Sequence, residues 1–243
     1  MAGWGKWLWG GLGWAMLGPI GGILGFALGA VRDQAHNQTY GIGEGAYPRT
    51  RPGDFGVSLL VLCAAVMRVD EQQRKSELSF VKDFFIRNFG EAYARERMIL
   101  FKDILKQDYP LPDVCRQIRR HMDYPSRLEL IHLLFGLAQA DGQVHKAESH
   151  VIGQIGGYLG LSRADYQSIK AMFVKDTTSA YRILEIDPGV DRETVKKAYR
   201  RMANKFHPDK VNHLGGDFLK VAEVKFKAVN GAYQDIRQER GWA

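Results

Sequence analysis

The tripeptide His207-Pro208-Asp209 is the group of side chains in this 243-residue sequence that is best placed to do chemistry. An imidazole and a carboxylate two residues apart could act as an acid–base pair or supply two metal ligands. No nucleophile and no third ligand lies nearby in the sequence, so we expect no catalysis here and predict that the chain is not an enzyme. Pro208 disfavours helix at His207, which predicts an exposed loop at this point.

Four carboxylates form a second candidate group, because Asp70 and Glu77 have the same seven-residue spacing as Asp141 and Glu148. Similar apolar segments, AAVMRVD and GLAQADG, accompany the two pairs, and the common offset indicates an internal repeat. If the two copies pack about a pseudo-twofold axis, the four side chains could bind a divalent cation, since hard cations take oxygen ligands. The simpler alternative, which we favour, is that each Asp caps a helix and each Glu lies at that helix's positive end.

Two antiparallel helices must hold the His207 tripeptide at their connection. The first helix begins after a good N-cap, Asp191, and has apolar residues from Val195 to Phe206 along one face. The second carries an apolar stripe that includes Phe226, Val229 and Tyr233. The opposite face of the first helix bears five basic residues, Lys196, Lys197, Arg200, Arg201 and Lys205. Such a face is solvated or binds an acidic surface of a partner.

The region before this hairpin has helical periodicity from about residue 55 to 174, with no convincing alternating strand. Turn residues interrupt it at Asn88-Phe89-Gly90, at Asp108 to Pro112, at Asp123-Tyr124-Pro125 and at Gly160. Helices of this length joined by short breaks predict a compact bundle, and the whole chain is predicted to be all-α.

The amino-terminal region contains an uncharged stretch over residues 7–31, between Lys6 and Arg32. A helix of that length would be about 37 Å long, enough to span a hydrocarbon core. We predict a single transmembrane anchor over residues 1–32 and a polar juxtamembrane linker over 33–54. Because only Lys6 precedes the span while Arg32, Arg49, Arg51 and a basic body follow it, the short amino terminus is expected outside and the body in the cytoplasm.

Glycines within this span have the spacing of a helix-packing face. The residues concerned are Gly18, Gly21, Gly22, Gly25 and Gly29. A ridge of small residues lets two helix backbones approach closely in lipid, so a homodimer through the span is one prediction. The alternative, to which we give equal weight, is a glycine-rich span that crosses the membrane without a partner helix.

Composition excludes several other classes of protein. The two cysteines, Cys63 and Cys115, lie far apart in apolar contexts, which predicts reduced, buried thiols and neither a disulfide scaffold nor a zinc site. The net charge of +7 could indicate nucleic-acid binding. However, no aromatic stacking platform lies among the basic residues, so no nucleic-acid partner is expected.

The carboxy-terminal region, residues 177–243, resembles a J domain, the module that defines DnaJ-type co-chaperones. The resemblance rests on YRILEI, KKAYRRMANKFHPDK and FKAVNGAYQDI. It implies that His207, Pro208 and Asp209 contact an ATPase chaperone of the DnaK class and promote its ATP hydrolysis. It also implies that the five basic residues steer docking onto an acidic surface of that partner.

The middle region, residues 55–175, resembles TerB-like domains through the stretch AQADGQVHKAE at 138–148. In the first copy of the repeat, Glu71 stands where glycine is usual. The resemblance implies an all-helical fold and leaves the activity open.

The order of anchor, TerB-like bundle and J domain resembles the DjlA family of membrane-anchored bacterial co-chaperones. It implies a protein of the inner membrane that recruits a DnaK-type chaperone to clients. The bundle would supply targeting, because the sequence has no Gly/Phe-rich region and no CxxCxGxG repeats. The alternative is a metal-binding stress sensor or resistance protein in which the J domain is accessory. No cofactor is expected beyond that divalent cation.

Overall fold

The computed structural model describes residues 19–20, 22–23, 55–69, 74–214 and 216–242. Every regular element in these ranges is helical, which confirms the all-α prediction. The helices of the middle region are α2 (Phe55–Met67), α3 (Arg74–Phe89), α4 (Glu91–Ile104), α5 (Leu111–His121), α6 (Tyr124–Ala138), α7 (Lys146–Tyr158) and α8 (Arg163–Phe173). The carboxy-terminal region contains α9 (Ser179–Ile183), α10 (Arg192–Lys205), the 3₁₀ helix η1 (Pro208–Leu214) and α11 (Gly216–Glu239).

Helices α2 and α6 form the centre of the middle bundle. Nearly every residue from Val57 to Met67 is buried, and so are most residues of α6. A helix that is apolar on all sides needs neighbours on all sides. Accordingly, α2 contacts α3, α4, α6 and α7, while α6 contacts α2, α3, α7, α8 and η1.

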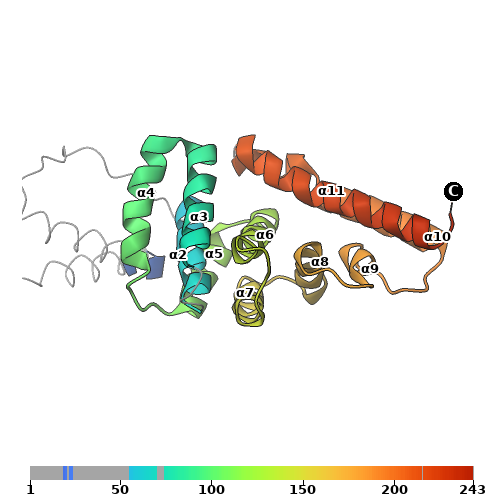
Figure 1. The fold of residues 1–243 in the computed structure, drawn as a ribbon, viewed down its shortest axis with the longest axis horizontal. Helices are drawn as coiled ribbons and strands as arrows, with labels where there is room; N and C mark the ends of the chain where they lie inside the picture. Colours follow the sequence, from blue (N-terminus) through green and yellow to red (C-terminus); the bar gives the residue numbers. More distant parts are fainter. Residues whose placement is uncertain (1–18, 21, 24–54, 70–73, 215, 243) are drawn as a thin grey trace, which may run out of the picture.

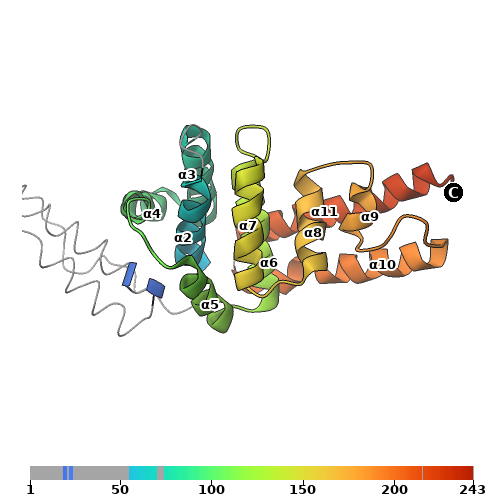
Figure 2. The same ribbon diagram turned by 90° about the horizontal axis from the view of Figure 1, so that it is seen from below.

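The two copies of the internal repeat occupy equivalent helix pairs. The first copy is α2 followed by α3, and the second is α6 followed by α7; Figure 2 shows these pairs side by side. The turn of the second copy contains Gly142 with φ of 110°, a conformation that glycine adopts without steric cost. Asp70 of the first copy lies outside the described residues.

The carboxy-terminal hairpin is built from α10 and α11, whose connection points back toward the bundle. Figures 1 and 2 show α11 starting near the bundle and running away from it to the carboxy terminus. The buried residues Tyr181, Leu184, Met202, Val229 and Ile236 form the core between α9, α10 and α11.

The α11 stripe differs from the sequence prediction at Phe226. Phe226 is only partly buried, whereas the neighbouring Lys225 is 1% exposed. Lys225 lies in phase with the buried residues Ala222, Val229 and Ile236, so the helix turns the lysine and not the phenylalanine inward.

The junction between bundle and hairpin is short and well packed. Asp176 accepts a hydrogen bond from the Thr178 N–H at 2.9 Å and forms an ion pair with Arg182. The Ser168 hydroxyl of α8 donates to the Ile183 carbonyl of α9 at 2.8 Å. These contacts hold α8 and α9 together.

Only a small part of the predicted anchor belongs to the described residues. Ile20 and Ile23 are buried, and the Ile20 N–H donates to Gln117 Oε1 of α5 at 2.9 Å. Within the ranges described above, the chain forms no helix with the length and apolar character of a membrane span. Of the five glycines proposed to pack in lipid, Gly22 is described and buried; the other four, and the linker 33–54, lie outside the described residues.

Candidate functional site

The tip of the hairpin presents His207 and Asp209 to solvent. Their side chains are 48% and 83% exposed, and Pro208 begins the 3₁₀ helix that follows α10. The Asp209 N–H donates to His207 Nδ1 at 3.3 Å. The Asp209 carboxylate also lies 3.4 Å from Nδ1, so Nδ1 is engaged within the tip and Nε2 is the ring nitrogen that can meet a partner.

The Phe226 ring supports the imidazole from the neighbouring helix. The ring centroids of His207 and Phe226 lie 6.1 Å apart at an interplanar angle of 82°, an edge-to-face contact. This contact explains why Phe226 is not fully inside the core. It links the orientation of His207 to the position of α11.

Four of the five predicted docking residues are wholly or partly exposed along α10, although the Arg201 guanidinium also donates to the Leu184 carbonyl at 3.0 Å and lies 3.5 Å from Glu185. Lys197 and Arg200 are exposed, and the side chains of Lys196 and Arg201 are 42% and 53% exposed. Lys196 lies 3.8 Å from Glu193 of the same helix. The face can therefore meet an acidic surface of another protein.

Lys205 has a different environment, because it bridges the hairpin and the bundle. Its ammonium forms ion pairs with Asp165 of α8 and with Glu185, the latter at 2.8 Å. Asp165 also accepts hydrogen bonds from the Ser162 hydroxyl at 2.6 Å and the Tyr124 hydroxyl at 2.5 Å. Burial acts to raise the pKa of Asp165, but Lys205 and these two hydroxyls hold that pKa below its usual value, so the pair stays charged.

A second interdomain ion pair is fully buried. Lys225 of α11 pairs with Glu129 of α6, and the two side chains are 1% and 2% exposed. Burial raises the pKa of Glu129 and lowers that of Lys225, while the charge of each partner opposes the other's shift. The Lys225 ammonium also lies 5.1 Å from the centroid of the Phe206 ring.

His132 of α6 completes the surroundings of this buried pair. Burial, reinforced by the charge of Lys225, holds the pKa of His132 well below its usual value, so the imidazole is neutral at pH 7. Its ring packs against Phe173, with centroids 4.8 Å apart.

Sequence reasoning did not identify Glu129, Asp165 or Lys225. A usable signal was present, since Glu129 interrupts the apolar run from Leu128 to Ala138 and Lys225 falls on an apolar stripe. A charged residue within an apolar pattern is buried with a partner or disrupts the fold. Which residue is the partner depends on the packing of α6 against α11.

The repeated carboxylates partly converge. Glu77 and Glu148 are each 2% exposed, and Glu77 lies close enough to Glu148 to influence the pKa of its carboxyl group. Burial is the main cause that raises the pKa of Glu148. Each Glu lies in the first turn of its helix, as predicted.

The prediction that Asp141 caps the following helix was wrong. His145 is the N-cap of α7, and its N–H donates to Glu148 Oε2 at 2.9 Å. Asp141 instead stabilises the preceding turn, where it accepts from the Gln143 N–H at 3.2 Å and lies 3.2 Å from His145 Nε2. No group of three or more His, Cys, Asp or Glu side chains within the described ranges is arranged to hold a metal ion.

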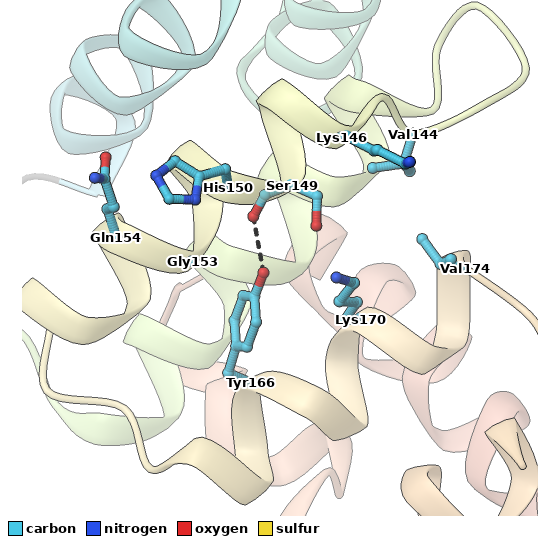
Figure 3. Close-up of a pocket in the computed structure, with 9 residues that line it drawn as sticks. All are labelled: Val144, Lys146, Ser149, His150, Gly153, Gln154, Tyr166, Lys170 and Val174. Carbon is cyan, nitrogen blue, oxygen red and sulfur yellow. Dashed lines mark hydrogen bonds between the residues drawn. The ribbon is translucent and has the colours of Figure 1, made fainter.

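A hollow of about 590 Å³ lies between α7 and α8. Figure 3 shows the Tyr166 hydroxyl directed at the Ser149 carbonyl, to which it donates at 2.9 Å. Gly153 leaves room for that ring, since a Cβ atom there would lie 3.2 Å from the hydroxyl. The titratable groups that line the hollow are Lys146, His150, Tyr166 and Lys170. The two lysines can bind an anion, and no carboxylate lines the hollow to form an acid–base pair.

Comparison with known proteins gives three adjoining matches. Residues 1–44 match the co-chaperone DjlA transmembrane domain, residues 57–171 match the tellurite resistance protein TerB, and residues 179–240 match the DnaJ domain. The co-chaperone protein DjlA of Vibrio parahaemolyticus is 26% identical over 246 residues, which cover 86% of this chain and 86% of the relative. The DjlA protein of Haemophilus influenzae is 22% identical over 278 residues, with coverage of 95% and 96%. No solved structure matches the chain.

Proposed function

We propose that this chain, a DjlA-type protein with a transmembrane domain, a TerB domain and a J domain, stimulates ATP hydrolysis by a DnaK-type ATPase and recruits that ATPase to clients at the membrane. The observation that carries the proposal is the hairpin tip. His207 and Asp209 are exposed there, next to an exposed basic face on α10. The chain itself acts as a regulator and not as an enzyme.

The proposed mechanism is allosteric. A J domain that binds one conformation of the ATPase better than another shifts the population toward that conformation. The exposed cations of α10 would steer the encounter, and the His207 imidazole would contact the ATPase directly. No covalent chemistry by the chain is required.

A single-turnover ATPase assay with a purified DnaK-type protein tests the proposal. Wild-type chain in detergent should accelerate hydrolysis, and His207→Gln should abolish the acceleration without loss of helical signal in circular dichroism. His121→Gln, which changes an exposed histidine at the end of α5, is the matched control and should behave as wild type. Normal acceleration by His207→Gln would refute the role assigned to the tip.

The proposed topology places the amino terminus outside and the body in the cytoplasm, on the basis of the flanking charges. Protease added to sealed inverted vesicles should then remove the J domain. Protection of the J domain in these vesicles would show the opposite orientation.

Client recruitment is assigned to the TerB domain. A pull-down from solubilised membranes should separate its partners from the ATPase. Proteins retained by wild type and by His207→Gln would be clients or bundle partners, while the ATPase should be retained by wild type alone. If His207→Gln retained neither the ATPase nor any other protein, the separate roles of the TerB domain and the J domain would be contradicted.

A metal-dependent sensor is the second candidate function, and the meeting of Glu77 with Glu148 near Asp141 is the observation that favours it. Titration of the chain with calcium, magnesium or zinc distinguishes the two functions. Tight stoichiometric binding that is lost in Asp141→Ala and Glu148→Ala would support the sensor. If none of these cations binds tightly to the wild-type chain, the co-chaperone function is the better explanation.

A further inference from the structure

The two interdomain ion pairs lie on either side of the hairpin tip. Lys205 stands two residues before His207 and binds Asp165 of α8. Lys225 directly precedes Phe226, whose ring meets the His207 imidazole, and binds Glu129 of α6. Each arm of the hairpin is therefore attached to a different helix of the TerB bundle, close to the tip.

The side chains of the tip make local contacts, to each other and to the Phe226 ring. His207 and Asp209 are exposed and are joined to each other by a local hydrogen bond. Pro208 and Asp209 belong to η1, which packs against α11 and also contacts α6. The attachments of Lys205 and Lys225 act together with this packing to hold the tip relative to the bundle.

We infer that Glu129 and Asp165 are positioning residues for the J domain, which fix the direction of His207-Pro208-Asp209 through Lys225 and Lys205. The inference rests on the proposed function. Neither carboxylate reaches the exposed face, since Glu129 is 2% and Asp165 4% exposed. Two residues needed for J-domain action thus lie in the TerB domain, outside the J-domain sequence.

Positioning and docking predict different kinetic effects. The exposed cations of α10 determine how readily the ATPase is bound, so their loss should raise the half-saturating concentration of the chain. If the tip points in another direction, the basic face of α10 is unchanged, but His207 is misplaced relative to the ATPase in the bound complex. Loss of a positioning residue should therefore lower the maximal stimulation and leave half-saturation nearly unchanged.

The test measures single-turnover ATP hydrolysis over a range of concentrations of the full chain. Glu129→Gln and Asp165→Asn should each lower maximal stimulation by about fivefold or more, because small displacements of a positioned group can cost up to about a hundredfold in rate. The matched controls are Glu96→Gln and Asp83→Asn, which change exposed acids on α4 and α3. Amide hydrogen exchange should be faster around His207 in the two variants and not in the controls.

A rescue variant separates positioning from general damage. Lys225→Met combined with Glu129→Leu replaces the buried pair by apolar side chains of similar size, which keeps the interface packed. This double variant should recover most of the maximal stimulation lost in Glu129→Gln. If Glu129→Gln fails to fold, Asp165→Asn and the double variant still provide the test.

Unchanged or increased maximal stimulation in the folded single variants would overturn the inference, and so would a folded double variant as weak as Glu129→Gln. Wild-type chain that fails to stimulate the ATPase would instead refute the proposed function, and the inference with it. If the wild-type chain stimulates the ATPase and the single variants stimulate it equally well, only the positioning role is refuted.

Discussion

Replacement of Lys225 by methionine should destabilise the folded chain strongly and in a pH-dependent way. Met fills much of the space of the lysine stem but leaves the Glu129 carboxylate buried without its counter-charge. The wild-type carboxylate is already incompletely satisfied, because its Oε2 receives no hydrogen bond from any described residue. Removing one member of a buried ion pair typically costs about 3–5 kcal/mol.

The cost is limited by protonation of Glu129. A glutamate with a pKa of about 4.3 in the unfolded chain, if neutral in the folded variant, costs about 3.7 kcal/mol at pH 7 and about 1 kcal/mol at pH 5. The sign follows from the raised folded-state pKa: the stability of the variant is greatest at low pH and is lost as pH rises. Destabilisation by Lys225→Met should therefore be several-fold larger at pH 7 than at pH 5.

Urea denaturation of the detergent-solubilised chain, followed by circular dichroism, measures this effect. The matched comparison is Lys225→Met with Glu129→Leu, which should be as stable as wild type or more stable, since apolar replacement of a buried pair is often neutral or favourable. A loss below about 1 kcal/mol at pH 7 would be typical of a solvated pair and would refute the burial argument. Equal losses at both pH values would refute the protonation argument.

Three further predictions concern other parts of the chain. Lys197→Ala with Arg200→Ala should raise the half-saturating concentration in the ATPase assay at low salt, and the difference from wild type should shrink at high salt. Hydrogen bonds to the Asp176 carboxylate, chiefly from Arg182, lower its pKa to about 2, below the value of about 3.9 in the unfolded chain. Asp176→Asn should therefore destabilise the chain above pH 4, and this effect should disappear as the pH of a denaturation series falls toward 2. Burial raises the pKa of Cys115 to about 12 and also raises that of Cys63, so mass spectrometry should show slow alkylation of both thiols at pH 8 in the native chain and fast alkylation in urea.

The helices and the tip were predictable because they depend on local patterns. Asp191 caps α10 by accepting from the Thr194 N–H at 3.0 Å, as its residue type and position indicated. The turn at Gly160, with φ of 73°, ends α7 where the sequence predicted a break. Cys63 and Cys115 are both buried and free, as their apolar contexts indicated.

Predictions failed where competing local partners or three-dimensional neighbours decided the outcome. Asp141 had the right residue type for a cap, but His145 takes the cap position and Asp141 stabilises the turn before it. The apolar stripe predicted Phe226 as a core residue, yet helix phase turns Lys225 inward and places Phe226 beside His207. Lys205, whose residue type indicated a docking cation, pairs with Asp165 and Glu185 in the fold, and its docking role stays a prediction.

The sequence by itself determined the all-helical fold, the internal repeat and the His207-Pro208-Asp209 tip between two helices. These features follow from periodicity, capping and turn chemistry, which act over a few residues. Tertiary structure alone decided that the tip faces the bundle and that Glu129 and Asp165 form ion pairs with Lys225 and Lys205 beside it. Glu129 and Lys225 are 96 residues apart in the chain, and only the packing of α6 against α11 removes both from water and makes each the necessary partner of the other.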